Sequence, residues 1–252
     1  MARRLKVIEA GELVKAVIYT TPEPNDSPRV RAEKSKMTSL ARKIVNDRTA
    51  KGRLEMILAA NFTRSDLFVT PTYRDEDLPR TRKEAQADIQ RFIRALREVR
   101  KRLGIPLRYV YVTENVHGEG RFHHHLIVNA AGRDLETLIS LWGHGDVHVE
   151  QLAKKEWDGW AEYMAKESGD RPVGARMWTP SRNLEKPRVT THYVPDNVTI
   201  ATPINVHIIE RDERVTEYGY YGYIKYRSLP GCRPGQQNDE GGGSLYLACR
   251  KV

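Results

Sequence analysis

The chain has 252 residues, enough for one large domain or two small ones, and its 42 Lys and Arg against 33 Asp and Glu give a formal net charge of +9. This excess of positive charge favours an anionic partner, with nucleic acid as the first candidate. Two cysteines, Cys232 and Cys249, exclude a disulfide framework and a zinc module, and neither a membrane-spanning apolar run nor a signal peptide is present, so we expect a cytoplasmic protein without membrane contacts.

Residues 1–61 are predicted to form a basic, partly helical N-terminal extension. Val14–Thr20 has the β-branched content of a strand, and a turn-rich linker follows up to residue 36. Residues 37–61 place apolar and basic side chains at helical spacing, with Gly52 as the candidate for an interruption.

Residues 62–187 begin with a strand and a helix. Leu67–Tyr73 has the composition of a strand, although Pro71 cannot donate to a β-ladder. Thr81–Leu103 is the clearest helix of the chain, with Thr81 and Glu84 as a candidate capping box. Its apolar residues recur at intervals of three and four and form one stripe: Ala85, Ile89, Phe92, Leu96, Val99 and Leu103.

The same region continues with two strands (107–114 and 122–129), a short helix (134–142) and a further strand (145–152). The order strand, helix, strand, strand, helix, strand is that of a ferredoxin-like βαββαβ unit. We therefore predict an α+β fold in which an antiparallel sheet carries its helices on one face.

Three consecutive histidines lie on the second of the paired strands. Because alternate side chains of a strand share a face, His123 and His125 can reach one ion while His124 points to the opposite face. An eight-residue connection or a bulge places Glu114 beside His123. Two imidazoles and a carboxylate form a plausible divalent-metal site with positions open for substrate. The alternative is a strand with ordinary, satisfied histidines.

Lys155–Ser168 is predicted to be a helix whose inner side includes two tryptophans. Tyr163 and Lys166 are three residues apart and share a face. A tyrosine hydroxyl needs activation before it attacks phosphorus, a metal ion polarises a phosphate, and a neighbouring ammonium offsets negative charge. Together with the metal face, this pair makes a set for phosphodiester transesterification. Tyr73 is the competing nucleophile, and an isolated Tyr163–Lys166 pair would be an ordinary exposed pair.

Residues 188–252 are predicted to form a β-rich C-terminal extension with a flexible loop over 230–243 and a closing strand over 244–250. Its strands include 205–209 and 218–226. Alternate tyrosines on the second of these pack a sheet or stack nucleic-acid bases: Tyr218, Tyr220, Tyr221, Tyr223 and Tyr226.

Three segments of the chain resemble, in the same order, the motifs of the HUH-superfamily single-stranded DNA nucleases, in particular the rolling-circle replication initiators of phages and plasmids. LFVTPTY (67–73) resembles the first motif strand, RFHHHLIVN (121–129) the His-hydrophobe-His motif, and YMAKE (163–167) the Tyr-x-x-Lys motif. NFTRSD (61–66) and RMWTPSRNLEKP (176–187) are similar to segments of the filamentous-phage branch. The resemblance covers roughly residues 37–187, and it departs from the family pattern at His124 and Pro71.

The resemblance implies an HUH endonuclease domain over residues 62–187 that nicks and rejoins a single-stranded replication origin, folded as a hairpin. Tyr163 would attack the scissile phosphate, keep the 5′ end as a phosphotyrosine and release a free 3′ hydroxyl. Mg²⁺ or Mn²⁺ held by Glu114, His123 and His125 would orient the phosphate, and Lys166 would assist. Because the sequence contains no ATPase P-loop, a host helicase and polymerase would be the partners.

Other classes of protein use parts of this set. A relaxase or a single-tyrosine transposase has the same chemistry, and finding an origin on the encoding element would separate them from an initiator. A non-haem iron oxygenase uses the same ligands but needs neither Tyr163 nor Lys166. A nucleic-acid-binding module without catalysis could use the same sheet and would leave a single-stranded oligonucleotide uncut.

Overall fold

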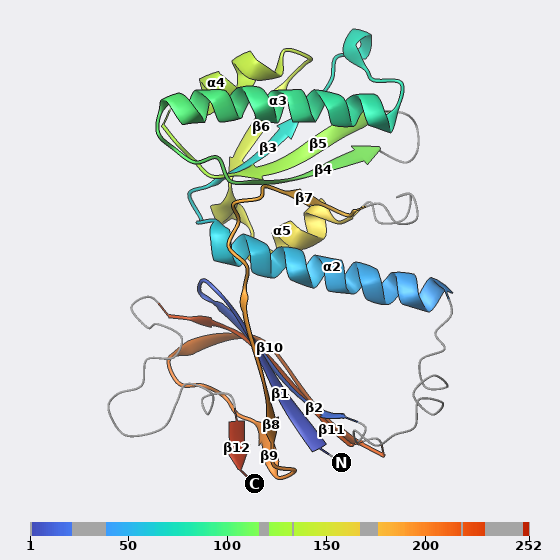
Figure 1. Ribbon diagram of the computed structural model, residues 1–252, viewed down its shortest axis with the longest axis vertical. Coiled ribbons are helices and arrows are strands. Elements are labelled where there is room, and N and C mark those ends of the chain that lie inside the picture. Colours follow the sequence, from blue (N-terminus) through green and yellow to red (C-terminus); the bar gives the residue numbers. More distant parts are fainter. Residues whose placement is uncertain are drawn as a thin grey trace. The chain divides into compact units, whose positions relative to one another are not determined.

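The computed structural model describes residues 2–21, 39–115, 121–132, 134–166, 176–217, 219–229 and 249–251. The chain divides into two compact units, which we call the terminal unit (residues 1–42 and 186–252) and the central unit (residues 43–185) (Figure 1). Each unit contains a five-stranded antiparallel sheet, and four α-helices lie in the described part of the chain. The predicted α+β class is confirmed.

The sheet of the central unit has the order β6-β3-β5-β4-β7. Its strands are β3 (Leu67–Pro71), β4 (Tyr109–Asn115), β5 (Phe122–Val128), β6 (Val147–Gln151) and β7 (Thr179–Pro180). Helix α3 (Arg82–Arg102) joins β3 to β4, and α4 (Asp134–Trp142) joins β5 to β6. The predicted βαββαβ order is therefore present, and β7 adds an unpredicted strand beside β4.

Helices α3 and α4 cover one face of this sheet (Figure 1). The apolar core between them combines α3, alternate residues of β5 and α4, and it includes Ile89, Phe92, Leu96, Phe122, Leu126, Val128, Leu138 and Trp142. The predicted stripe of α3 stops before Leu103, which follows the helix and is 61% exposed. Arg100 is buried in its place and forms an ion pair with Asp134 of α4, with Nη2 and Oδ1 2.6 Å apart.

The strand pairing removes the conflict at Pro71. The Thr72 N–H donates to the carbonyl of Asp146 on the β6 side, so alternation turns the nitrogen of Pro71 toward β5. Pairing between β3 and β5 ends at Val69, and the proline therefore costs the sheet no ladder bond.

Helices α5 (Trp157–Met164) and α2 (Ser39–Asn61) lie on the other side of the central sheet (Figure 1). The Trp160 ring stacks on Phe68 of β3 at 4.6 Å between centroids, and its indole N–H donates to the carbonyl of Leu152. The predicted restriction of helices to one face therefore holds for α3 and α4 only. Helix α2 continues through Gly52 without interruption.

The sheet of the terminal unit has the order β10-β11-β2-β1-β8. Its strands are β1 (Ala2–Ala10), β2 (Leu13–Thr21), β8 (Arg188–Val194), β10 (Val206–Thr216) and β11 (Gly219–Ser228), and β9 (Val198–Ile200) pairs separately with β12 (Cys249–Lys251). The predicted N-terminal and C-terminal extensions thus contribute to one sheet. The predicted linker over 22–36, the loop over 230–243 and Tyr218 lie outside the described residues.

None of the helices in the described segments combines the length and the apolar character needed to cross a lipid bilayer.

Candidate metal centre and its tyrosine

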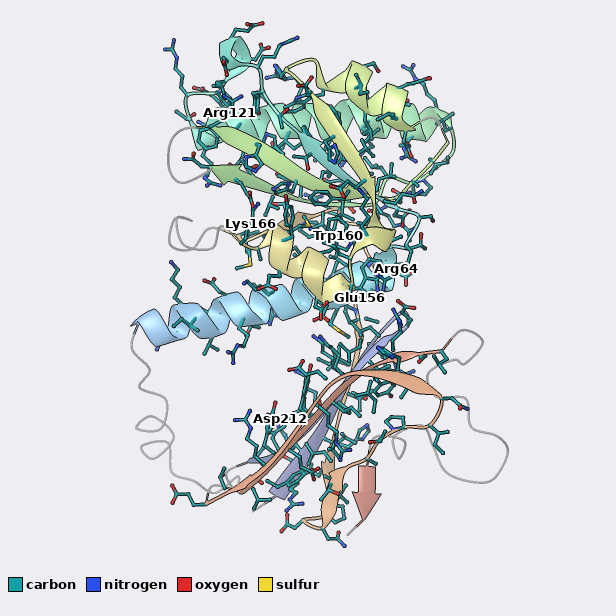
Figure 2. The ribbon with its side chains drawn as sticks, turned by 180° about the vertical axis from the view of Figure 1, so that it is seen from behind. Arg64, Arg121, Glu156, Trp160, Lys166 and Asp212 are labelled. Atoms are coloured by element: carbon teal, nitrogen blue, oxygen red, sulfur yellow. The ribbon has the colours of Figure 1, made fainter. Side chains whose placement is uncertain are left out.

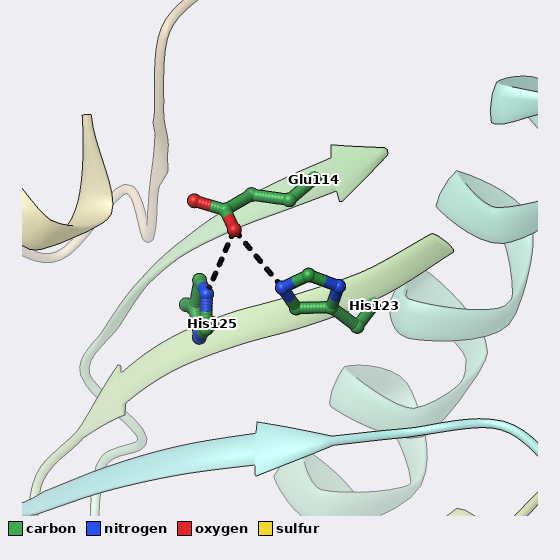
Figure 3. Close-up of side chains that lie close together, drawn as sticks. All are labelled: Glu114, His123 and His125. Carbon is green, nitrogen blue, oxygen red and sulfur yellow. Dashed lines mark hydrogen bonds and ion pairs between the residues drawn. The ribbon is translucent and has the colours of Figure 1, made fainter. Parts of the chain in front are cut away.

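The pairing of β4 with β5 sets the positions of the predicted metal ligands. Glu114 lies opposite His123, and Val112 lies opposite His125, which is the predicted register. Because cross-strand partners share a face, Glu114, His123 and His125 point to the side of the sheet away from α3 and α4 (Figure 3). His124 points into the core on the opposite side.

The three side chains converge on one carboxylate oxygen. Nε2 of His123 and Nε2 of His125 donate hydrogen bonds to Oε2 of Glu114 at 2.9 and 3.1 Å (Figure 3). Burial disfavours the charged form of Glu114, but the hydrogen bonds from both histidines outweigh it and lower the pKa of Glu114 to about 2. Burial lowers the pKa of His125. Ionised Glu114 and neutral His125 are the forms that bind metal ions.

The second oxygen of the Glu114 carboxylate tests whether a cation fits this group. Oε1 is buried and has no hydrogen-bond partner among the described residues, although a buried charged group normally has all its lone pairs satisfied. The ligand atoms of Glu114, His123 and His125 lie within 4.8 Å of one another. The group could therefore hold a divalent metal ion, and its mixed nitrogen and oxygen donors fit a first-row transition metal.

Two residues of β3 support His125 and were not singled out in the sequence. Oγ1 of Thr70 lies 3.4 Å from Nδ1 of His125, and the Phe68 ring stacks on the imidazole at 5.3 Å between centroids. A hydrogen bond to the second ring nitrogen fixes the orientation of a metal-binding histidine. Strand alternation within LFVTPTY could have placed Phe68 and Thr70 on the metal face.

His124 has a different environment from its neighbours. It is fully buried, with Nε2 2.9 Å from the Tyr73 hydroxyl and Nδ1 3.0 Å from Oγ1 of Thr113. Burial lowers the pKa of His124 to about 3, so the ring is neutral. Tyr73, the competing nucleophile, is also buried in this core, and burial raises its pKa. The structure therefore separates Tyr73 from the metal group by the thickness of the sheet.

Tyr163 lies on the metal face. Its ring is half-buried beside His125, with 5.1 Å between the ring centroids. The ammonium groups of Lys155 and Lys166 lie 3.9 and 4.3 Å from the centre of the Tyr163 ring. Nζ of Lys166 is also 3.5 Å from Oε2 of Glu114. The tyrosine, the two lysines and the ligand group are thus gathered at one place on the sheet.

The contact between Lys166 and Tyr163 differs from the predicted one. Helix α5 ends at Met164, so Lys166 lies in the turn after the helix, next to the metal face (Figure 2). Lys155 was predicted within the helix but precedes it. The lysines therefore reach Tyr163 from opposite ends of a short helix instead of sharing one helical face.

Arg64 holds the start of α5 in place. Its guanidinium donates to the carbonyl of Lys155 at 2.7 Å and to the Glu156 carboxylate at 2.6 Å, and it lies 4.5 Å above the Trp157 ring (Figure 2). These contacts tie the loop before β3 to the helix that carries Tyr163. The sequence offered no local signal for this role, because Arg64 and Glu156 are 92 residues apart.

Two hollows adjoin the group. A small cavity of about 40 Å³ is lined by Glu114, Met164 and Arg176 among others. A groove of about 470 Å³ runs between α2 and residues 176–180, and Arg176, Met177 and Trp178 line both hollows. The metal face therefore opens toward a groove that contains basic and aromatic side chains.

Residues 66–168 match the family model of the replication-associated protein ORF2. The matched range runs from the residue before β3 to just beyond α5 and contains Glu114, His123, His125, Tyr163 and Lys166. This match supports a role in the initiation of replication. Neither a curated protein nor a solved structure matches the chain.

Proposed function

We propose that the protein is a metal-dependent, sequence-specific DNA nicking endonuclease and strand transferase that initiates rolling-circle replication at a single-stranded origin. One observation carries the proposal: Tyr163 lies against His125 of the candidate metal group, and the Lys166 ammonium contacts both the Tyr163 ring and Glu114. The match to a family of replication-associated proteins supports the biological role.

In the proposed reaction the Tyr163 hydroxyl attacks the scissile phosphorus of the origin strand. A bond forms between the tyrosine oxygen and phosphorus, and the bond from phosphorus to the 3′ oxygen breaks. The phenol loses its proton, the departing 3′ oxygen gains one, and the 5′ phosphate remains on the protein as a phosphotyrosine. Attack by a 3′ hydroxyl on this ester reverses the reaction and rejoins strands, so no further energy source is needed.

The lysines and the ligand group would serve the charges in this reaction. The Lys155 and Lys166 ammoniums beside Tyr163 would offset negative charge on the attacking oxygen. Glu114, His123 and His125 would hold Mg²⁺ or Mn²⁺, which polarises a phosphate when bound. Thr70 would keep the His125 ring turned toward the ion.

The substrate strand would continue from Tyr163 into the groove between α2 and residues 176–180. Arg53 and Arg176 line this groove and are suited to phosphates, and Trp178 is suited to stacking on bases. The indole N–H of Trp178 donates to the carbonyl of Ala50, which fixes the ring against α2. A host helicase and polymerase would be the partners that extend the free 3′ end.

The decisive experiment is incubation of the protein with the origin strand of its own genetic element and Mn²⁺. We expect a covalent protein–DNA species on a denaturing gel. Tyr163→Phe should abolish this species while preserving Mn²⁺ and DNA binding, because only one hydroxyl is lost. Tyr109→Phe is the matched control, since Tyr109 contacts the core beneath α3, and it should form the adduct normally. Peptide mapping that finds DNA on another tyrosine would refute the assignment.

The same experiment separates the alternatives. A relaxase or transposase would form the adduct on a transfer or transposon end instead of a replication origin. A non-catalytic binding protein would form no adduct on any strand. An iron oxygenase would form none either, and it would bind iron and consume oxygen.

A further inference from the structure

One face of the terminal sheet carries a row of aromatic and arginine side chains that crosses all five strands. Arg4 of β1 lies opposite Tyr193 of β8 on one side and Tyr19 of β2 on the other. Tyr19 lies opposite Tyr221 of β11, which lies opposite Arg214 of β10. We call these five residues the aromatic row.

The opposite face of this sheet is the core of the terminal unit. Leu5, Ile18 and Ile224 are buried in it, and Leu5 and Ile18 each adjoin a row residue in the chain. Alternation along each strand therefore turns the aromatic row away from the core. The tyrosines of β11 are divided by the same rule: Tyr220 and Tyr226 are buried in the core, and Tyr221 is 38% exposed on the other face.

The row presents ring faces and guanidinium groups to solvent. Tyr193 is 62% exposed and the Arg214 side chain is 66% exposed. The Arg4 guanidinium lies 4.7 Å above the Tyr193 ring and donates to its hydroxyl, while that of Arg214 lies 5.7 Å from the centre of Tyr221. Arginine thus accompanies tyrosine in an arrangement that the protein itself holds in place.

Charge on the neighbouring row also favours an anionic ligand. Lys6, Val17 and Tyr223 lie side by side there, and Asp212 of β10 ends that row. The Asp212 carboxylate is ion-paired with Arg214 (Figure 2). Lys6 and Arg4 therefore leave the two rows with a net positive charge.

We propose that the aromatic row is a second binding site for single-stranded DNA, distinct from the metal face and outside the range matched by the family model. Exposed tyrosine rings stack unpaired bases of any sequence, and arginines between them contact phosphates. Five strands spaced at about 4.8 Å give a row of roughly 19 Å, long enough for several stacked nucleotides. Paired bases have no free ring face for such stacking, so the site selects single strands.

The inference rests on the proposed function in one respect only. A protein that nicks an origin strand has single-stranded DNA on both sides of the cut, and a second site would hold a flank of that strand. Tyrosine and arginine are also common in protein interfaces, so a second copy of the chain is the rival occupant.

The test measures binding of fluorescent oligo-dT to the full-length protein in EDTA, where no strand can be cut. The double variant Tyr193→Ala with Tyr221→Ala should weaken binding by about tenfold or more, since each base–aromatic stack contributes about 1–3 kcal/mol. The conservative pair Tyr193→Phe with Tyr221→Phe keeps the rings and should bind within about twofold of the original protein. Val215→Ala, at an 82% exposed residue of β10 outside the row, is the control.

Two further measurements make the result specific. An iodouracil-substituted strand should photo-crosslink to peptides that contain Tyr193 or Tyr221. Adduct formation on a short strand that covers only the nick site should be unchanged in the double Ala variant. Unchanged oligo-dT affinity in that variant would overturn the inference, and so would a variant that alters only the oligomeric state in sedimentation. Failure of adduct formation in every protein would refute the proposed nicking activity and leave the binding result standing.

Discussion

The Lys166 ammonium lies 3.5 Å from Oε2 of Glu114, the oxygen that also accepts hydrogen bonds from His123 and His125. The same ammonium is 4.3 Å from the centre of the Tyr163 ring. One flexible side chain therefore connects the metal-binding carboxylate with the proposed nucleophile. Because it is itself a cation, it competes with a metal ion for Glu114 while it favours negative charge on the tyrosine.

This relationship predicts opposite effects of Lys166→Ala on two measurements. Mn²⁺ affinity, measured by calorimetry, should stay the same or increase, since a competing positive charge is removed from Glu114. The rate of adduct formation should fall by about tenfold or more, since charge on the attacking oxygen is less well offset. Lys154→Ala is the control, because Lys154 pairs with Glu150 away from the site. Weaker Mn²⁺ binding in Lys166→Ala would contradict this role.

The three histidines are expected to respond differently to substitution. His123→Ala and His125→Ala should each abolish measurable Mn²⁺ binding, because each removes one of three ligands. His124→Ala should preserve Mn²⁺ affinity in the folded protein. It should nevertheless lower the free energy of unfolding by about 1–3 kcal/mol, because the buried Tyr73 and Thr113 hydroxyls lose their partner. Loss of Mn²⁺ binding in folded His124→Ala would disprove the register-based assignment.

Thr70 should act on metal affinity through His125. Thr70→Val keeps the shape of the side chain but removes the oxygen that lies 3.4 Å from Nδ1. Mn²⁺ affinity should fall by about tenfold, the lower end of the range for lost partners of metal-binding histidines. Thr72→Val is the comparison, since the Thr72 hydroxyl donates to the backbone of Asp146 instead. Equal Mn²⁺ affinities in the two variants would rule out a positioning role for Thr70.

The buried ion pair between Arg100 and Asp134 should be a principal link between α3 and α4. Either Arg100→Ala or Asp134→Ala leaves one charge buried without its partner, so the free energy of unfolding should fall by about 3–5 kcal/mol in urea titrations. Arg94→Ala, on the exposed side of α3, should change it by less than about 0.5 kcal/mol. A small effect at Arg100 would show that solvent reaches the pair.

Local patterns in the sequence determined the features that depend on near neighbours in the chain. Alternation along a strand sufficed to place His123 and His125 on one face and His124 on the other, and the expected connection placed Glu114 beside them. Helical periodicity and turn residues gave the order of elements and hence the βαββαβ unit. These signals have periods of two to four residues, so a short stretch contains all of the information.

Tertiary structure alone decided the contacts between segments far apart in the chain. It placed α5 on the metal face, ended that helix before Lys166, and brought Arg64, Thr70 and Lys155 to the site. It buried Arg100 where the sequence suggested an apolar stripe, because Asp134 approaches from α4. It also paired β1 with β8, near the other end of the chain, and so assembled the aromatic row. No local period encodes such pairings, because they depend on which surfaces can be buried together once the elements have formed.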